Sequence, residues 1–100
     1  MEPGALVVVH CTGPREKFWG LLLSLTTAGA TLRAISLDSF DDFLRQFQTA
    51  GPALIGPATI FFPAHRVERI EVDESAGAVE GFGTRFERVT GRKPGEALLA

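Results

Sequence analysis

Apolar residues along this chain gather into five short segments that are typical of β-strands. Residues 5–11 read Ala-Leu-Val-Val-Val-His-Cys, a β-branched stretch that follows a glycine. Residues 18–26 alternate in character, so one face of that segment is strongly apolar. The other three segments are residues 31–37, 59–62 and 69–73. A glycine-containing turn at residues 27–30 predicts that the second and third segments form a hairpin.

The spacing of apolar residues changes after Ser39, where it becomes helical. One stripe at positions i, i+3, i+4 and i+7 predicts an amphipathic helix over residues 39–50, and it consists of Phe40, Phe43, Leu44 and Phe47. Ser39 and Asp42 resemble a capping box, and Gly51 followed by Pro52 ends the helix. This insertion therefore separates the third predicted strand from the fourth.

The last quarter of the chain is predicted to be helical. Phe82, Phe86 and Val89 are spaced for a second short helix that ends at Gly91, and Pro94 begins a last turn. Glycines at positions 81 and 83 weaken this helix by about 1 kcal/mol each relative to alanine. We therefore expect the helix to need a surface on which to pack.

The element order predicts one α+β domain over residues 1–100, arranged as β-β-β-α-β-β-α. Short strands with little between them favour an antiparallel meander that closes into a small SH3/Sm-like β-barrel over residues 5–73, with the helix at 39–50 inserted. Residues 77–100 form the C-terminal helical segment. Gly20, inside the second strand, marks a place where that strand bends.

Two blocks of this pattern resemble the Sm-like superfamily of small β-barrels (the Hfq and LSm type). The first block is a β-branched strand, a charged glycine-containing turn and a bent strand, at residues 7–9, 12–17 and 18–22. The second is an apolar strand that passes through a tight turn into another strand, at residues 60–72. The resemblance covers residues 5–72 and implies a barrel that assembles into a homo-oligomeric ring and binds RNA. The turn at residues 27–30 lacks the Asp or Asn usual in the family.

The resemblance also implies a nucleic-acid site at His65 and Arg66, in the turn between the last two strands. His65 lies where the bacterial members carry a pore-facing histidine, while Ala64 stands in place of their lysine. An arginine in such a turn could hold a phosphate through paired hydrogen bonds. The alternative is a solvated turn, because a net charge of −2 is unlike the basic excess of most nucleic-acid-binding domains.

The apolar segment around Ile60, Phe61 and Phe62 predicts an oligomer interface. Consecutive side chains in a strand point to opposite faces, so one phenylalanine is expected in the core and the other outside. An apolar edge strand is prone to association unless it is paired or covered. We therefore expect a homo-oligomer that pairs through this strand. The alternative is a protein-interaction or regulatory module in which the C-terminal helix covers the barrel and no nucleic acid binds.

The composition predicts neither an enzyme nor a cofactor-binding protein. One cysteine and two histidines are too few for a typical zinc site, and His10 and Cys11 point to opposite faces of a strand. The acidic cluster of Asp38, Asp41 and Asp42 lies at a helix start, where the helix dipole explains it. We expect no metal, cofactor or small-molecule substrate.

The start of the chain is unlike a signal peptide and no segment is long enough to span a membrane, so the expected location is the cytoplasm.

Overall fold

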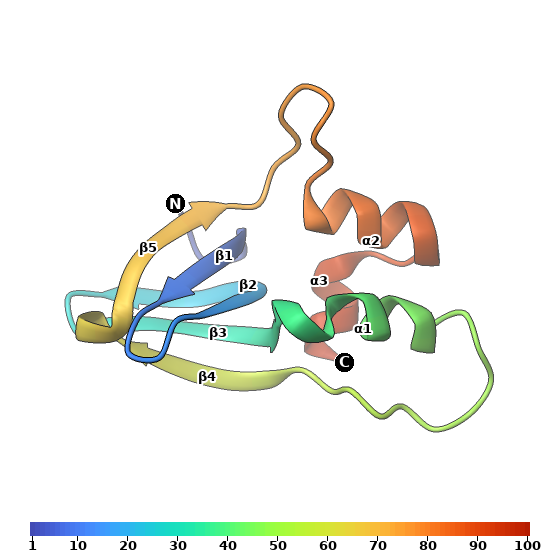
Figure 1. Ribbon diagram of the computed structural model, residues 1–100, viewed down its shortest axis with the longest axis horizontal. Coiled ribbons are helices and arrows are strands. Elements are labelled where there is room, and N and C mark those ends of the chain that lie inside the picture. The colour runs from blue at the N-terminus through green and yellow to red at the C-terminus, as the bar shows by residue number, and fades with distance from the viewer.

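The computed structural model describes residues 1–100 as a five-stranded antiparallel sheet with three helices (Figure 1). The strands are β1 (Leu6–Cys11), β2 (Glu16–Thr26), β3 (Gly29–Ser36), β4 (Ala58–Pro63) and β5 (Val67–Val72). Their order across the sheet is β4-β3-β2-β1-β5, so β4 and β5 are the two edges. The sheet is open: no strand pairing joins β4 to β5, although only the 3₁₀ turn η2 (Ala64–Arg66) separates them in sequence.

One face of the sheet carries a core of mostly small and medium apolar residues. Val7 and Val9 of β1 are fully buried on this face. The residues buried with them are Cys11, Leu22, Ala30, Leu32, Ala34 and Phe62. The rings of Phe18 on β2 and Phe62 on β4 lie 5.0 Å apart between centroids, although these strands are not neighbours in the sheet. The sheet therefore curves enough for side chains of non-adjacent strands to meet.

The three helices cover the other face of the sheet. They are α1 (Phe40–Gln46), α2 (Phe82–Thr90) and α3 (Pro94–Leu99), and they gather toward one end of the strands (Figure 1). Trp19 of β2 is fully buried between them, with ring centroids 5.2 Å from Phe40 and 5.9 Å from Phe86. Phe86 and Leu98 are also fully buried in this cluster. The helices at the end of the chain are thus part of the core.

The predicted strands, the inserted helix and their order are confirmed, and two local predictions are wrong. The helix expected over residues 39–50 ends at Gln46, because the amides of Phe47 and Gln48 donate to carbonyls only three residues back. The side chain of Gln46 accepts from the backbone of Leu54 and Ile55 and donates to the Ile55 carbonyl, which holds the loop that follows. Ser39 makes no capping hydrogen bond; Ser36 caps the preceding 3₁₀ turn (Leu37–Ser39) by accepting from the Asp38 amide. The final predicted turn is the separate helix α3.

Candidate functional site

The turn η2 presents His65 to solvent at the corner where β4 passes into β5. Pro63 precedes the turn in an extended conformation and Val67 follows it in an extended conformation, so η2 is a single 3₁₀ turn between two strands. His65 is exposed and makes no hydrogen bond or ion pair. The structure therefore places His65 where a ligand could reach it.

Arg66, the other residue expected at this site, holds the turn between β1 and β2. Its Nε donates to the Thr12 carbonyl at 3.0 Å, and its Nη2 donates to the Pro14 carbonyl at 2.9 Å. The same Nη2 forms an ion pair with Glu16 at 3.0 Å. The Thr12 amide in turn donates to the Arg66 carbonyl. Most donors of this guanidinium are occupied within the chain, so the residue is first of all a structural clamp.

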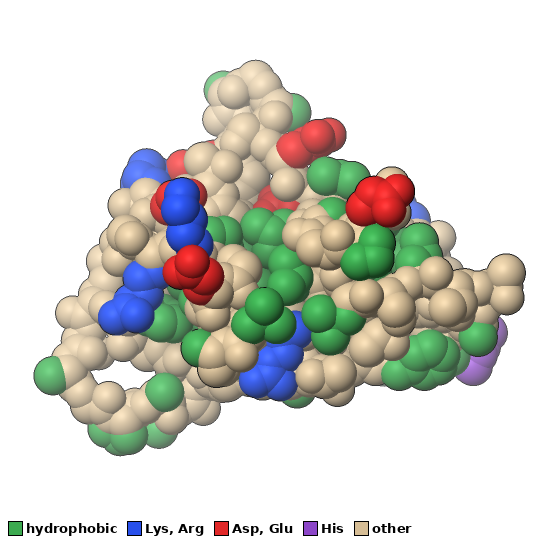
Figure 2. All heavy atoms as spheres, turned by 180° about the vertical axis from the view of Figure 1, so that it is seen from behind, with side chains coloured by type: hydrophobic (Ala, Val, Ile, Leu, Met, Phe, Trp, Pro, Cys, Tyr) green, Lys and Arg blue, Asp and Glu red, His purple; other side chains and the backbone are tan.

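The residues expected at an oligomer interface lie on β4, and they do not share one environment. Phe62 is buried at 4% exposure and Ile60 packs beside it against the inner core, whereas Phe61 is 54% exposed. The prediction that one phenylalanine would be buried and the other exposed is confirmed. Leu25 of β2, 49% exposed, adds a second apolar side chain at this end of the sheet. Figure 2 shows apolar side chains on the surface at the end of the molecule where β4 approaches β5.

The two edge strands differ in charge. The β4 sequence, Ala-Thr-Ile-Phe-Phe-Pro, contains no charged residue. In β5, Glu68, Arg69 and Glu71 are all exposed. Charged side chains on an edge strand oppose pairing with another chain. The edge of β4 is therefore the one available for association.

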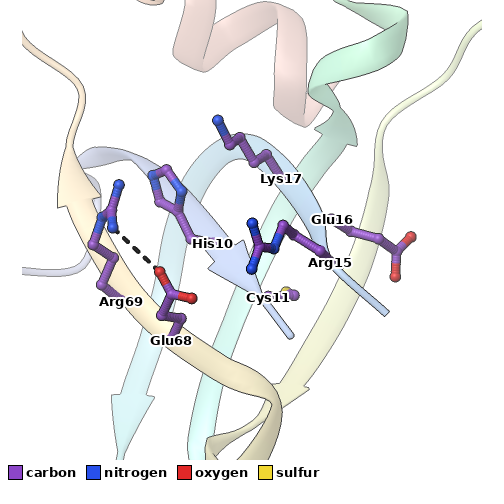
Figure 3. A pocket seen from close by; sticks show the side chains of 7 residues that line it. All are labelled: His10, Cys11, Arg15, Glu16, Lys17, Glu68 and Arg69. Atoms are coloured by element: carbon purple, nitrogen blue, oxygen red, sulfur yellow. Dashed lines mark hydrogen bonds and ion pairs between the residues drawn. The ribbon is translucent and has the colours of Figure 1, made fainter. Parts of the chain in front are cut away.

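A surface cavity of about 250 Å³ opens beside the start of β2 and is lined mainly by charged residues (Figure 3). The lining consists of His10, Cys11, Arg15, Glu16, Lys17, Glu68 and Arg69. Figure 3 shows the side chains of Arg15, Lys17 and Arg69 grouped around His10, while Glu16 points away from them. The cavity thus brings together basic side chains from β1, β2 and β5.

One group that lines this cavity, Cys11, and one beside it, Glu71, have shifted pKa values. The pKa of Glu71 is lowered, chiefly by its hydrogen bond from Arg69 and further by the positive charges of His10 and Arg69. Burial raises the pKa of the Cys11 thiol, which is only 1% exposed. Since the thiolate is the nucleophilic form of cysteine, Cys11 is poorly suited to nucleophilic chemistry.

The basic residues near the end of the chain form salt bridges on the surface. Arg88 binds Glu80 at 2.8 Å, and Lys93 binds Glu87 at 2.6 Å. Arg85 binds Asp41 of α1 at 2.8 Å. These cations are paired with carboxylates and form no basic patch.

Comparisons with protein-family models, with curated proteins and with solved structures find no match for this chain. None of its helices combines the length and the apolar character needed to cross a membrane.

The sequence analysis did not predict the basic cavity, because Arg15 and Lys17 fall in a segment that was expected to be a turn. Their two-residue spacing at the start of a strand indicates that both side chains lie on one face of the sheet. Only the strand register shows that His10 and Arg69 lie beside them.

Proposed function

We propose that this chain is a non-enzymatic, Sm-like β-sheet protein that assembles with copies of itself through the edge of β4. The observation that carries the proposal is that β4 is an unpaired edge strand without charge, with Phe61 half exposed on it. An edge of this kind presents free backbone donors and acceptors to any strand that can lie beside it. A second copy of the chain supplies such a strand.

The Sm-like assignment within this proposal is supported by the arrangement of the strands. Five antiparallel strands curve around a common apolar core, and a single 3₁₀ turn joins the two edge strands. Contact between Phe18 and Phe62 brings β2 and β4 together across that core. These features resemble a small, strongly bent barrel that is left open between its two edge strands, of which β4 carries no charge that would oppose pairing.

Phe61→Lys is expected to abolish self-association while leaving the fold intact. The new charge lies on the edge where strands would pair, and the side chain it replaces is already 54% exposed. Light scattering during gel filtration should give a multiple of the 10.8 kDa chain mass for the original protein and the monomer mass for the variant.

Leu54→Lys is the control, because Leu54 is 88% exposed in the loop before β4 and this variant also replaces an exposed apolar side chain by lysine. This variant should keep the original mass. A monomeric original protein would contradict the proposal, and so would equal effects of the two substitutions. A monomer would instead favour the alternative of an interaction or regulatory module that binds a different protein.

RNA binding at η2 is the second candidate function, and the exposure of His65 at the corner between β4 and β5 favours it. An imidazole in this position can stack on a base or donate to a phosphate. In an oligomer the turn would recur once per copy, so weak contacts would add through multivalency. Arg66 would contribute mainly by holding the shape of the turn.

His65→Ala is expected to weaken binding of a short oligouridylate by about tenfold in an oligomer, because each copy loses one contact. Fluorescence anisotropy at low salt measures the change, and Ala64→Ser is a control at the neighbouring exposed position. Arg66 is unsuitable for this test, since its replacement would also release the turn between β1 and β2. Absence of oligouridylate binding in the original protein would remove this candidate.

A further inference from the structure

Two basic side chains stand apart from all the others in this chain. Most of the ten Lys and Arg residues pair with carboxylates; the paired ones are Arg45, Arg66, Arg69, Arg85, Arg88 and Lys93. Arg33 donates to the Leu98 carbonyl, and Arg92 lies over the Phe47 ring. Arg15 and Lys17 alone make no hydrogen bond, ion pair or cation–π contact, and both line the same cavity.

The strand register brings further positive charge to this place. Lys17 of β2 is the direct partner of His10 on β1, and His10 is in turn the direct partner of Arg69 on β5. Three basic side chains therefore form a row across three neighbouring strands, and Arg15 lies two residues from Lys17. Lys17 and Arg69 flank His10, so the register places two permanently charged side chains on one face of three adjacent strands. Such an arrangement suits the binding of an anion.

The carboxylates near these basic side chains pair with Arg69 and His10 but not with Arg15 or Lys17. Glu68 and Glu71 both bind Arg69, at 3.2 and 3.0 Å, and Glu71 also pairs with His10. Glu16 is engaged with Arg66 and points away from the cavity (Figure 3). The positive charges of Arg15 and Lys17 thus remain unpaired in the lining of the cavity.

We propose that this cavity binds a phosphate group between Arg15 and Lys17, with Arg69 and His10 behind it. A guanidinium offers a fork of donors that matches phosphate oxygens, and an ammonium adds a compact charge. Both a phosphate monoester and a phosphodiester present at least two unesterified oxygens, so either can accept hydrogen bonds from both residues at once. The cavity is distinct from the β4 edge, and the inference does not depend on self-association. The phosphate could belong to a small phosphorylated ligand or to a nucleic-acid backbone.

The test is titration of the ¹⁵N-labelled full chain, followed by amide chemical shifts, with inorganic phosphate and with potassium chloride at matched ionic strength. Two further titrations, with adenosine monophosphate and with a short oligouridylate, distinguish the two sources. The test variant is Arg15→Gln with Lys17→Gln. Its control is Arg45→Gln with Lys93→Gln, which removes the same charge from two exposed sites away from the cavity.

Phosphate should produce saturable shifts centred on the amides of His10, Lys17 and Arg69, which chloride does not reproduce. The test variant should bind at least about tenfold more weakly, while the control binds like the original protein. Comparable affinities for the mononucleotide and the oligomer would assign the site to a small ligand, and much tighter binding of the oligomer would assign it to a nucleic-acid backbone. Shifts that chloride reproduces, or equal losses in the two double variants, would overturn the proposal.

Discussion

Gly20→Ala is expected to destabilise this protein by about 3 kcal/mol, because there is no space for a methyl group at this position. Gly20 of β2 is the direct partner of Ala34 on β3. A Cβ atom on Gly20 would lie 2.6 Å from the Ala34 Cβ and would also overlap the backbone carbonyl of Arg33. The obstacle is largely backbone of the neighbouring strand, so it cannot be relieved by rotating a side chain.

Steric overlap decides that Gly20→Ala lowers the free energy of unfolding. Gly20 does not have a positive φ, so alanine at this position would by itself be favoured through the lower entropy of the unfolded chain, by about 0.4–1 kcal/mol. Overpacking in the core costs more than this gain. Urea unfolding followed by fluorescence of the only tryptophan measures the difference.

Gly56→Ala provides the control for the Gly20 substitution. Gly56 is exposed in the loop before β4, and a Cβ atom there would meet nothing within 4 Å. This variant should be as stable as the original protein or slightly more stable. If Gly20→Ala were equally stable, the close approach of β2 to β3 would be disproved.

Asp73→Ala is expected to lower the free energy of unfolding by about 3 kcal/mol, because one carboxylate satisfies three donors. Asp73 follows β5, and its Oδ1 accepts from the Phe82 amide at 2.8 Å. Its Oδ2 accepts from the Gly83 amide at 2.7 Å and from the Trp19 indole at 2.9 Å. The residue thus caps α2 from nine residues away and ties that helix to β2.

Removal of this carboxylate would leave the indole N–H of a fully buried tryptophan without a partner. Such a loss costs more than the hydrogen bond itself contributes. Asp73→Asn should show a smaller loss, because its amide oxygen can still accept. Asp38→Ala is the control, since Asp38 is exposed and its side chain makes no hydrogen bond or ion pair. A change in the unfolding midpoint with denaturant is the readout, and equal midpoints for Asp73→Ala and Asp38→Ala would contradict the capping role.

The glycine at position 83 shows how tertiary packing reverses a local preference. Glycine in a helix is unfavourable by propensity, which is why the sequence predicted a weak second helix. A Cβ atom on Gly83 would lie 2.7 Å from the Leu6 side chain and 3.1 Å from the Asp73 carboxylate. The helix accepts the glycine because it allows α2 to approach β1 closely and allows the cap to form.

The candidate site was only partly accessible to sequence reasoning. The resemblance predicted a site at His65 and Arg66. In the structure the Arg66 guanidinium donates hydrogen bonds to the turn between β1 and β2. The uncompensated charges belong to Arg15 and Lys17. His10 and Arg69 line the same cavity, and Arg69 lies more than fifty residues away from Arg15 and Lys17 in the chain.

The sequence by itself determined the element types, the order of the strands and helices along the chain, and the opposite exposures of Phe61 and Phe62. These follow from periodicity, because side chains alternate in a strand and recur every three to four residues in a helix. Only the tertiary structure decided that β4 and β5 remain unpaired edges, that Asp73 caps α2, and that the basic row forms on one face. Those features depend on strand register and sheet curvature, which are set by long-range packing that no local pattern encodes.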